Sequence, residues 1–146
     1  MSNLSVFLDA DVIFAGSAAP TAHSASHIVL QLGEMTLIDC VTSTQAVTEV
    51  ERNLADKLPS KLSEFQLIVS RSLRVVSDPE LEELRQYKGQ ADPKDLPILV
   101  AAVREKCSSL LTFNIRHYHP SAVTITIHRP GEFVQTVRAI LSQIRT

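Results

Sequence analysis

Three acidic residues occupy places in the sequence from which they could bind a divalent cation. Asp9 comes directly after the apolar run Val6-Phe7-Leu8, Glu49 lies in a segment with helical spacing, and Asp95 precedes another such segment. Mg²⁺ and Mn²⁺ prefer oxygen ligands, and a set of carboxylates without thiolates disfavours zinc. A cation held in this way can activate water for hydrolysis and offset negative charge that develops on a reacting oxygen.

The aspartates of this set also have structural interpretations. Asp9 or Asp11 could cap the helix that follows, by accepting hydrogen bonds from its free N–H groups. Pro97 is tolerated only in the first helical turn, so a helix begins near Asp95 and makes that residue a candidate N-cap. Capping and metal binding are compatible at Asp95, because the positive end of a helix keeps a carboxylate ionised. Asp92 is a second, weaker candidate in the same stretch.

The choice between Glu49 and Glu51 stays open on spacing alone. An apolar stripe through Val47, Val50 and Leu54 includes Glu51, whereas Glu49 lies well off it. A helix that borders both a core and a cleft uses two faces, so either glutamate could reach the site.

Asn114 follows a later apolar run and would add a polar ligand at the same edge, or serve as a turn residue. His23 and His27 are four residues apart, and His117 and His119 share a loop. Such pairs can bind zinc, but the sequence offers them no third and fourth ligands. We therefore expect the histidines to be solvated or hydrogen-bonded.

Short apolar runs alternate with segments of helical spacing, which predicts a mainly parallel sheet with helices on both faces. The expected strands are residues 5–8, 36–41, 73–76, 109–113 and 123–127. The expected helices are residues 24–33, 44–58, 60–70, 95–106 and 131–143, with Gly33 ending the first of them. Ligands bind such sheets beyond the carboxyl ends of the strands. We predict one α/β domain over residues 1–146, with its site at that edge.

The composition predicts a soluble globular protein. The chain has 146 residues, of which 45% are hydrophobic and 21% charged, and no apolar run approaches the ~20 residues that cross a bilayer. The amino-terminal residues do not read as a signal peptide, so we expect no membrane association and a cytoplasmic location. Cys40 and Cys107 belong to no Cys-x-x-Cys pair, which argues against a disulfide. The net charge of −2 argues against a broad duplex-binding surface.

The order and spacing of the motifs resemble the PIN-domain ribonucleases, particularly the VapC-like toxins of bacterial toxin–antitoxin pairs. The similarity spans nearly the whole chain. The matching stretches are Phe7–Val12, Thr48–Val50, Asp92–Leu99, Leu111–Asn114 and Arg129–Phe133.

This resemblance selects Glu49 over Glu51, and Asp95 over Asp92. It implies a three-layer α/β/α sandwich, an RNA substrate, a small antitoxin protein as partner and a homodimer. The expected ligands of Mg²⁺ or Mn²⁺ are Asp9, Glu49 and Asp95, and the expected catalytic residues of this endoribonuclease are those three with Asn114.

The chain departs from the family at three positions. Where this chain has Asn114 and His117, the family often has an Asp and another acid. Where this chain has Asp11, the family often has Asn. An alternative is therefore a degenerate, catalytically weak PIN domain that acts as a binding module. A further alternative is a phosphatase of the haloacid-dehalogenase type with Asp9 as nucleophile, but the sequence lacks a convincing downstream lysine and Gly-Asp acidic pair for it.

Overall fold

A parallel sheet forms the centre of the computed structural model, which describes residues 4–19, 24–121 and 124–144. Its strand order is β3-β2-β1-β4-β5, and every neighbouring pair is parallel. Parallel strands need crossover connections, which the helices supply. The strands are β1 (Ser5–Leu8), β2 (Asp39–Ser43), β3 (Arg74–Val76), β4 (Ser109–Leu111) and β5 (Thr126–His128).

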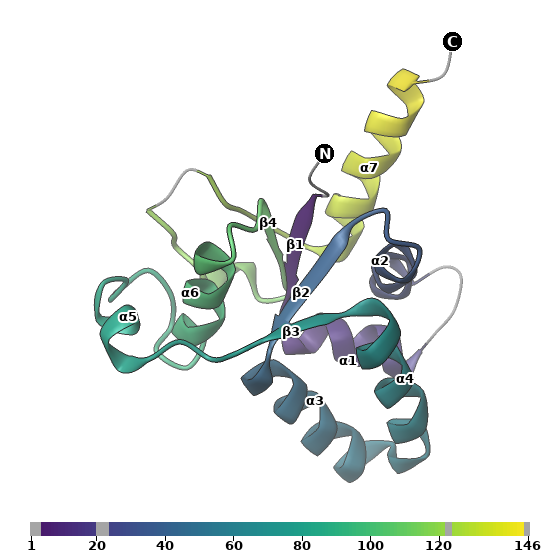
Figure 1. The fold of residues 1–146 in the computed structure, drawn as a ribbon, viewed down its shortest axis with the longest axis horizontal. Helices are drawn as coiled ribbons and strands as arrows, with labels where there is room; N and C mark the ends of the chain where they lie inside the picture. Colours follow the sequence, from purple (N-terminus) through teal and green to yellow (C-terminus); the bar gives the residue numbers. More distant parts are fainter. Residues whose placement is uncertain (1–3, 20–23, 122–123, 145–146) are drawn as a thin grey trace.

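Helices cover both faces of this sheet (Figure 1). In that view α5 and α6 lie on one side of the strands, and α1, α2 and α7 lie on the other. The predicted three-layer α/β/α sandwich is thus confirmed. The helices are α1 (Ala10–Ala18), α2 (Ala25–Glu34), α3 (Thr44–Lys57), α4 (Leu62–Ser72), α5 (Leu81–Arg85), α6 (Leu96–Arg104) and α7 (Pro130–Ile144). None of the helices in the described part of the chain has the length and apolar character needed to span a bilayer.

The core is centred on β1, the middle strand of the sheet. Val6, Phe7 and Leu8 are completely buried, as are Leu110 and Leu111 of the adjacent β4. A parallel strand that is covered on both faces is apolar along its whole length, which explains the uninterrupted runs in the sequence. Burying a side chain as large as Phe7 or Leu8 stabilises the fold by about 1.5–3 kcal/mol.

The second strand lies later in the chain than residues 36–41, where it was predicted. Thr36 has a φ of 61°, in the left-handed region, and therefore belongs to the turn before β2. The strand instead continues into polar residues that are buried. The Thr42 hydroxyl donates to the Leu8 carbonyl at 2.9 Å, and Ser43 caps α3 by accepting from the Ala46 N–H at 3.3 Å. The prediction left Thr42 and Ser43 out of the strand because they are polar. Polar residues can nevertheless belong to a buried strand when their hydroxyls form hydrogen bonds inside the fold, as these do.

Gly33 does not end α2 as predicted, since the helix runs on to Glu34. Its role is close packing. A Cβ at this position would lie 2.7 Å from the Ser72 carbonyl oxygen and 2.8 Å from the Cys40 sulfur. The glycine therefore lets α2 approach both β2 and the end of α4.

The remaining differences concern element ends and two helices without predicted ranges. Strand β4 ends at Leu111 rather than residue 113, and β5 begins at Thr126, while residue 123, the first of the predicted strand, lies outside the described residues. Helix α1 is apolar on most sides, so it lacks a clear helical stripe. Helix α5 is five residues long and none of its residues is buried, so no apolar pattern marks it.

Candidate active site

The four predicted site residues line one open cavity at the carboxyl edge of the sheet. Asp9 directly follows β1, Glu49 lies in α3 directly after β2, Asp95 stands at the start of α6, and Asn114 follows β4. All four contribute to a cavity of about 510 Å³. The sheet topology thus brings together residues from four separate parts of the chain.

Asp9 is 7% exposed, and both of its carboxylate oxygens accept hydrogen bonds. Oδ1 accepts from the Ala10 N–H at 2.8 Å, which makes Asp9 the N-cap of α1. Oδ2 accepts from the Tyr118 hydroxyl at 2.7 Å and from the Thr112 hydroxyl at 3.0 Å. Of the two capping candidates, Asp9 therefore caps the helix, and three donors fix the orientation of its carboxylate.

Burial raises the pKa of Asp9 above its ordinary value, and the charge of Asp95 adds to this effect. The hydrogen bonds from Tyr118, Ala10 and Thr112 act in the opposite direction and lower the pKa of Asp9. Such a carboxylate is costly to keep ionised unless positive charge lies close to it.

Asp11 lies in the first turn of α1 and holds the segment that follows β4. Its Oδ2 accepts from the Phe113 N–H at 3.0 Å and from the Asn114 side-chain amide at 3.2 Å. In the part of the chain that the structure describes, its Oδ1 is buried without a hydrogen-bond partner. Burial, and next the charge of Asp9, raise the pKa of Asp11 to about 6.

Glu49 and Glu51 face different hollows of the molecular surface. Glu49 lines the cavity with Asp9 and Asp95, whereas Glu51 lines a separate hollow between α3 and α4, beside Phe65. Loss of hydration, then the charges of Asp9 and Asp95, raise the pKa of Glu49. The geometry favours Glu49, the residue that the resemblance selects.

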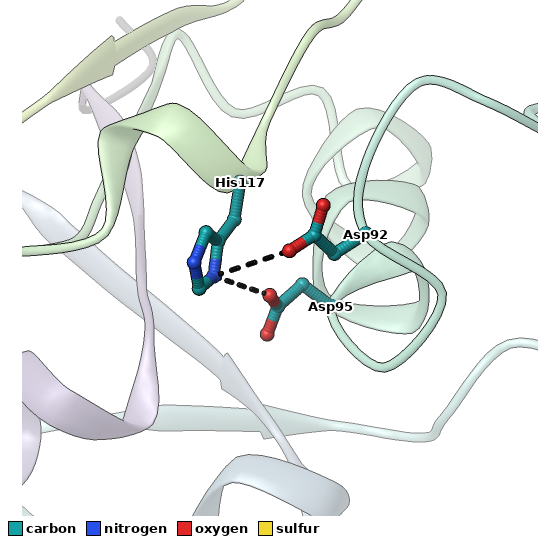
Figure 2. Close-up of side chains that lie close together, drawn as sticks. All are labelled: Asp92, Asp95 and His117. Carbon is teal, nitrogen blue, oxygen red and sulfur yellow. Dashed lines mark hydrogen bonds and ion pairs between the residues drawn. The ribbon is translucent and has the colours of Figure 1, made fainter.

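Asp95 occupies the N-cap position of α6, but its side chain makes no capping hydrogen bond. Its Oδ2 instead lies 2.9 Å from Nδ1 of His117. Figure 2 shows the imidazole of His117 directed at both Asp95 and Asp92, the acid that the sequence ranked second. Asp95 therefore both lines the cavity with Asp9 and Glu49 and contacts His117, which also lies close to Asp92.

The side chains of Thr112 and Asn114 form hydrogen bonds with Asp9 and Asp11. Thr112 is completely buried, and its hydroxyl donates to Asp9 while it accepts from the Asn114 N–H at 3.0 Å. It therefore orients Asp9. Asn114 is exposed and lines the cavity, with its amide bonded to Asp11.

The sequence analysis did not identify Lys94 or Tyr118 as residues of this edge. Arg52 and Lys94 line the cavity and lower the pKa of Glu49 through their charges. Their positions in the chain carry a weak signal, since each lies within three residues of a predicted ligand. Nothing in the sequence indicates that the Tyr118 ring turns inward to reach Asp9. Gln45, Thr48 and Asp78 complete the lining.

The histidines that the structure describes lie in different surroundings. His23 lies outside the described residues, and His27 has a buried Nδ1 without a hydrogen-bond partner among those residues. His117 lies against two aspartates, and His119 is exposed.

The donor set of the cavity fits a divalent cation. Asp9, Glu49 and Asp95 supply carboxylate oxygens, which Mg²⁺ and Mn²⁺ prefer. Burial is the main cause that raises the pKa values of Asp9 and Glu49, and repulsion from neighbouring carboxylates adds to it; a bound cation would offset the cost of keeping these groups ionised. The partnerless Oδ1 of Asp11 is a further buried atom that positive charge would compensate.

The PIN domain family model matches residues 5–116. Among solved structures, VapBC2 from Rickettsia felis, bound to a promoter DNA fragment, is similar with a TM-score of 0.62 and 15% identity, over 86% of this chain and 98% of that one. The sarcin–ricin-loop-cleaving toxin VapC20 from Mycobacterium tuberculosis has a TM-score of 0.53 and 13% identity, over 72% of this chain and 86% of that one. Curated protein sequences give no significant match.

The family model covers most of the chain, from β1 to the turn after β4, and it includes all four predicted site residues, which line the cavity. Both structural neighbours share the arrangement of the sheet and its helices. The chain therefore belongs to the PIN domain family.

Proposed function

We propose that this protein is an endoribonuclease that depends on Mg²⁺ or Mn²⁺ and acts as the toxin of a bacterial toxin–antitoxin pair. The observation that carries the proposal is the convergence of Asp9, Glu49 and Asp95 on one cavity of a PIN domain. The description of VapC20 as a toxin that cleaves the sarcin–ricin loop supports RNA as the substrate class.

Asp9, Glu49 and Asp95 would hold the cation, which when bound supplies Lewis-acid catalysis of phosphodiester hydrolysis. Tyr118 and Thr112 fix the Asp9 carboxylate through hydrogen bonds of 2.7 and 3.0 Å, so this ligand is held in position before substrate arrives.

Other residues of the cavity would act on the substrate itself. Arg52 and Lys94 offer positive charge at its wall to the phosphates of an RNA strand. Asn114 has a second amide hydrogen that can be donated to water or to a phosphate oxygen.

The test compares RNA cleavage by purified wild-type protein and D9N, with Mn²⁺ and with EDTA. We expect cleavage only with the ion, and a loss of about 100-fold or more in D9N, since several kcal/mol of charge stabilisation correspond to at least two factors of ten in rate. D56N is the matched control, because Asp56 is exposed on α3. Wild-type rates in D9N, or equal rates in EDTA, would overturn the proposal.

The alternative function, a degenerate PIN domain that acts as a binding module, predicts no RNA cleavage in the same experiment. Its support is that an amide, Asn114, stands at the cavity where a further acid would strengthen cation binding. It predicts RNA binding without cleavage, and no Mg²⁺ bound at millimolar concentration. Calorimetric titration with Mg²⁺ separates the two functions.

We propose a small antitoxin protein as the partner. One segment of it would fill the acidic cavity and thereby inhibit cleavage. Co-expression of an adjacent short reading frame with the chain tests this proposal. The product of that frame must co-purify with the chain and must suppress RNA hydrolysis.

We also propose a homodimer, for which the exposed Ile140, Leu141 and Ile144 of α7 are a candidate contact. Light scattering of the purified chain measures that state.

A further inference from the structure

We propose that the ring of Phe113 is a stacking platform for an unpaired RNA base beside the acidic cavity. This inference rests on the proposed RNA substrate and adds one requirement to it, which is that the nucleotide next to the cleaved phosphodiester is single-stranded. It is supported by the exposure of the ring, its place in the chain, its fixed backbone and the charge of the protein.

Phe113 differs from the other phenylalanines of the chain in its surroundings. Phe7, Phe65 and Phe133 are at most 2% exposed, and Phe14 is partly buried against the core. Phe113 is 43% exposed and lies outside the hydrophobic core that the described residues form. Single exposed apolar side chains are common on protein surfaces, so exposure alone assigns no role to this ring. Its place in the chain does.

Both neighbours of Phe113 in the chain belong to the candidate active site. Asn114 lines the cavity, and the Thr112 hydroxyl donates to the Asp9 carboxylate at 3.0 Å. Consecutive Cα atoms are about 3.8 Å apart, so the Phe113 side chain starts within one residue of the cavity wall. A side chain attached there can contact the base of a nucleotide whose phosphate lies in the cavity.

The backbone that carries the ring is held by hydrogen bonds at three consecutive residues. The Phe113 N–H donates to Oδ2 of Asp11 at 3.0 Å. The N–H of Thr112 donates to the His128 carbonyl at 3.0 Å, and the N–H of Asn114 donates to the Thr112 hydroxyl at 3.0 Å. Little backbone freedom is therefore lost when a base docks on the ring, which favours binding.

The charge of the protein makes an uncharged contact valuable at this position. The net charge of the chain is −2, and the cavity carries the carboxylates of Asp9, Glu49 and Asp95, which repel RNA. Stacking on an aromatic ring requires no charge, and every base has a π-face that can stack. Arg116, which is exposed three residues after the ring, adds positive charge for the phosphates of the same strand.

Stacking on a protein ring selects unpaired over paired RNA. A base inside a duplex is covered by its neighbours in the stack, and it must be extruded before a protein can contact its face. Bases in single-stranded loops, bulges and ends are free to stack on aromatic side chains. Phe113 therefore predicts a substrate that is single-stranded at the cavity.

A fluorescent variant tests the contact directly. The chain contains no tryptophan, so F113W introduces a single reporter at this position. The full-length variant is titrated at low ionic strength with oligouridine and, separately, with an RNA duplex, both in EDTA to keep cleavage out of the measurement. We expect the single strand to quench the tryptophan and the duplex to leave it unquenched. L67W, at an exposed leucine of α4 outside the cavity lining, is the control and must show no quenching.

An affinity series separates stacking from other contacts. Fluorescence anisotropy with labelled oligouridine compares the wild type with F113Y, F113L and F113A. We expect F113A and F113L to bind at least about fivefold more weakly, the loss that one stacked base predicts, and F113Y to bind like the wild type. F113L keeps an apolar side chain, so its loss distinguishes stacking from a hydrophobic contact. The loss must be the same factor at low and high salt, because no charge is removed. Circular dichroism verifies that each variant is folded.

Four outcomes overturn the stacking platform. They are equal RNA affinity of F113A and wild type, no quenching in F113W, no measurable binding of oligouridine by the wild type, and full affinity in F113L. An F113A variant that binds RNA normally but escapes inhibition by the co-expressed antitoxin also overturns it, because the ring would then contact protein. None of these measurements requires cleavage. A chain that binds RNA through Phe113 without cutting it would refute the nuclease proposal and leave this inference intact.

Discussion

At the scale of single residues, the position of Asp9 depends on two hydroxyl groups that come from the other end of the chain. Tyr118 and Thr112 both donate to the same carboxylate oxygen. The sequence identified Asp9 because a charge that follows a buried strand needs a partner. It did not identify Tyr118, because a tyrosine in a polar loop carries no sign of the atom that its hydroxyl will reach.

Removing the Tyr118 hydroxyl tests its positioning role. In Y118F the Asp9 carboxylate loses a charge-assisted hydrogen bond worth about 1.5–3 kcal/mol. We expect RNA cleavage to fall about tenfold and the Mn²⁺ concentration for half-maximal cleavage to rise. Y87F, which changes the other tyrosine of the chain, must leave both unchanged. A variant that loses thermal stability but keeps the wild-type Mn²⁺ dependence would show that Tyr118 has only a structural role.

The two glutamates of α3 provide a second matched comparison. Glu49 faces the acidic cavity and Glu51 faces the hollow beside Phe65. We expect E49Q to lower the rate of RNA cleavage by at least about tenfold, because one carboxylate that supports charge stabilisation is lost. E51Q must cleave at the wild-type rate. The reverse result would move the site to the other face of α3.

At the scale of elements, close approach of helices to the sheet requires small residues at particular places. Gly33 allows α2 to touch both β2 and the last residue of α4. The sequence treated this glycine as a helix end, because glycine is common there. Only the packing of three elements, which no local pattern contains, reveals its actual role.

Substitution of this glycine measures how tightly α2 is packed. In G33A the added Cβ meets the Ser72 carbonyl oxygen at 2.7 Å, a backbone atom that cannot rotate away. We expect the free energy of unfolding to fall by about 1–3 kcal/mol, measured by urea denaturation. G131A is the control, since a Cβ at Gly131 in α7 meets no atom within 4 Å. Equal stability of G33A and wild type would mean that the helix shifts freely.

The sequence predicted the type and order of most elements but placed several of their ends wrongly. Continuous apolar runs identified β1 and β4, since strands buried on both faces have no polar positions. Thr42 and Ser43 extended β2 beyond its apolar run, because their hydroxyls bond to the Leu8 carbonyl and the Ala46 N–H. Those partners lie outside any local window of sequence, so the end of this strand could not be read from it.

At the scale of the whole molecule, an ion-pair network joins the sheet edge to the layer that covers it. Arg74 of β3 contacts Asp39 of β2 at 2.9 Å and Glu105, just after α6, at 3.1 Å. Hydrogen bonds from Arg74 are the main cause that lowers the pKa of Asp39 and the pKa of Glu105 below their ordinary values. All three side chains are partly exposed, so solvent weakens the network.

These two shifts predict a pH dependence of stability that Arg74 controls. An acid with a depressed pKa binds fewer protons in the folded than in the unfolded chain, so its contribution is complete above the unfolded values of 3.8 and 4.5. That contribution is lost as the pH falls through the lower folded values. We expect R74Q to melt at a lower temperature than wild type at pH 7, with the difference shrinking below about pH 4.5.

Thermal denaturation at several pH values measures this difference. R71Q, at an exposed arginine of α4, is the control and must show no such narrowing. A constant gap between R74Q and wild type from pH 7 to pH 3 would contradict the network's role.

The sequence placed the acids at the correct edge of the molecule, but it could not say which of them would meet. Strand order decides this, because β1 lies between β2 and β4. The pairing of His117 with Asp92 and Asp95 likewise follows from the backbone bonds between two loops. Local sequence patterns identified each acid as a candidate site residue, but the strand order of the sheet determines which of these acids lie side by side.

The central position of β1 also determines when during synthesis the cavity is completed. Asp9 and the Thr112 hydroxyl that orients it are 103 residues apart. A ribosome that adds about 5–20 residues per second needs roughly 5–20 s to bridge that interval. Throughout it, the nascent chain has Asp9 but lacks Thr112, Asn114 and Tyr118. For the proposed ribonuclease, cleavage would therefore begin only after these later residues have been added.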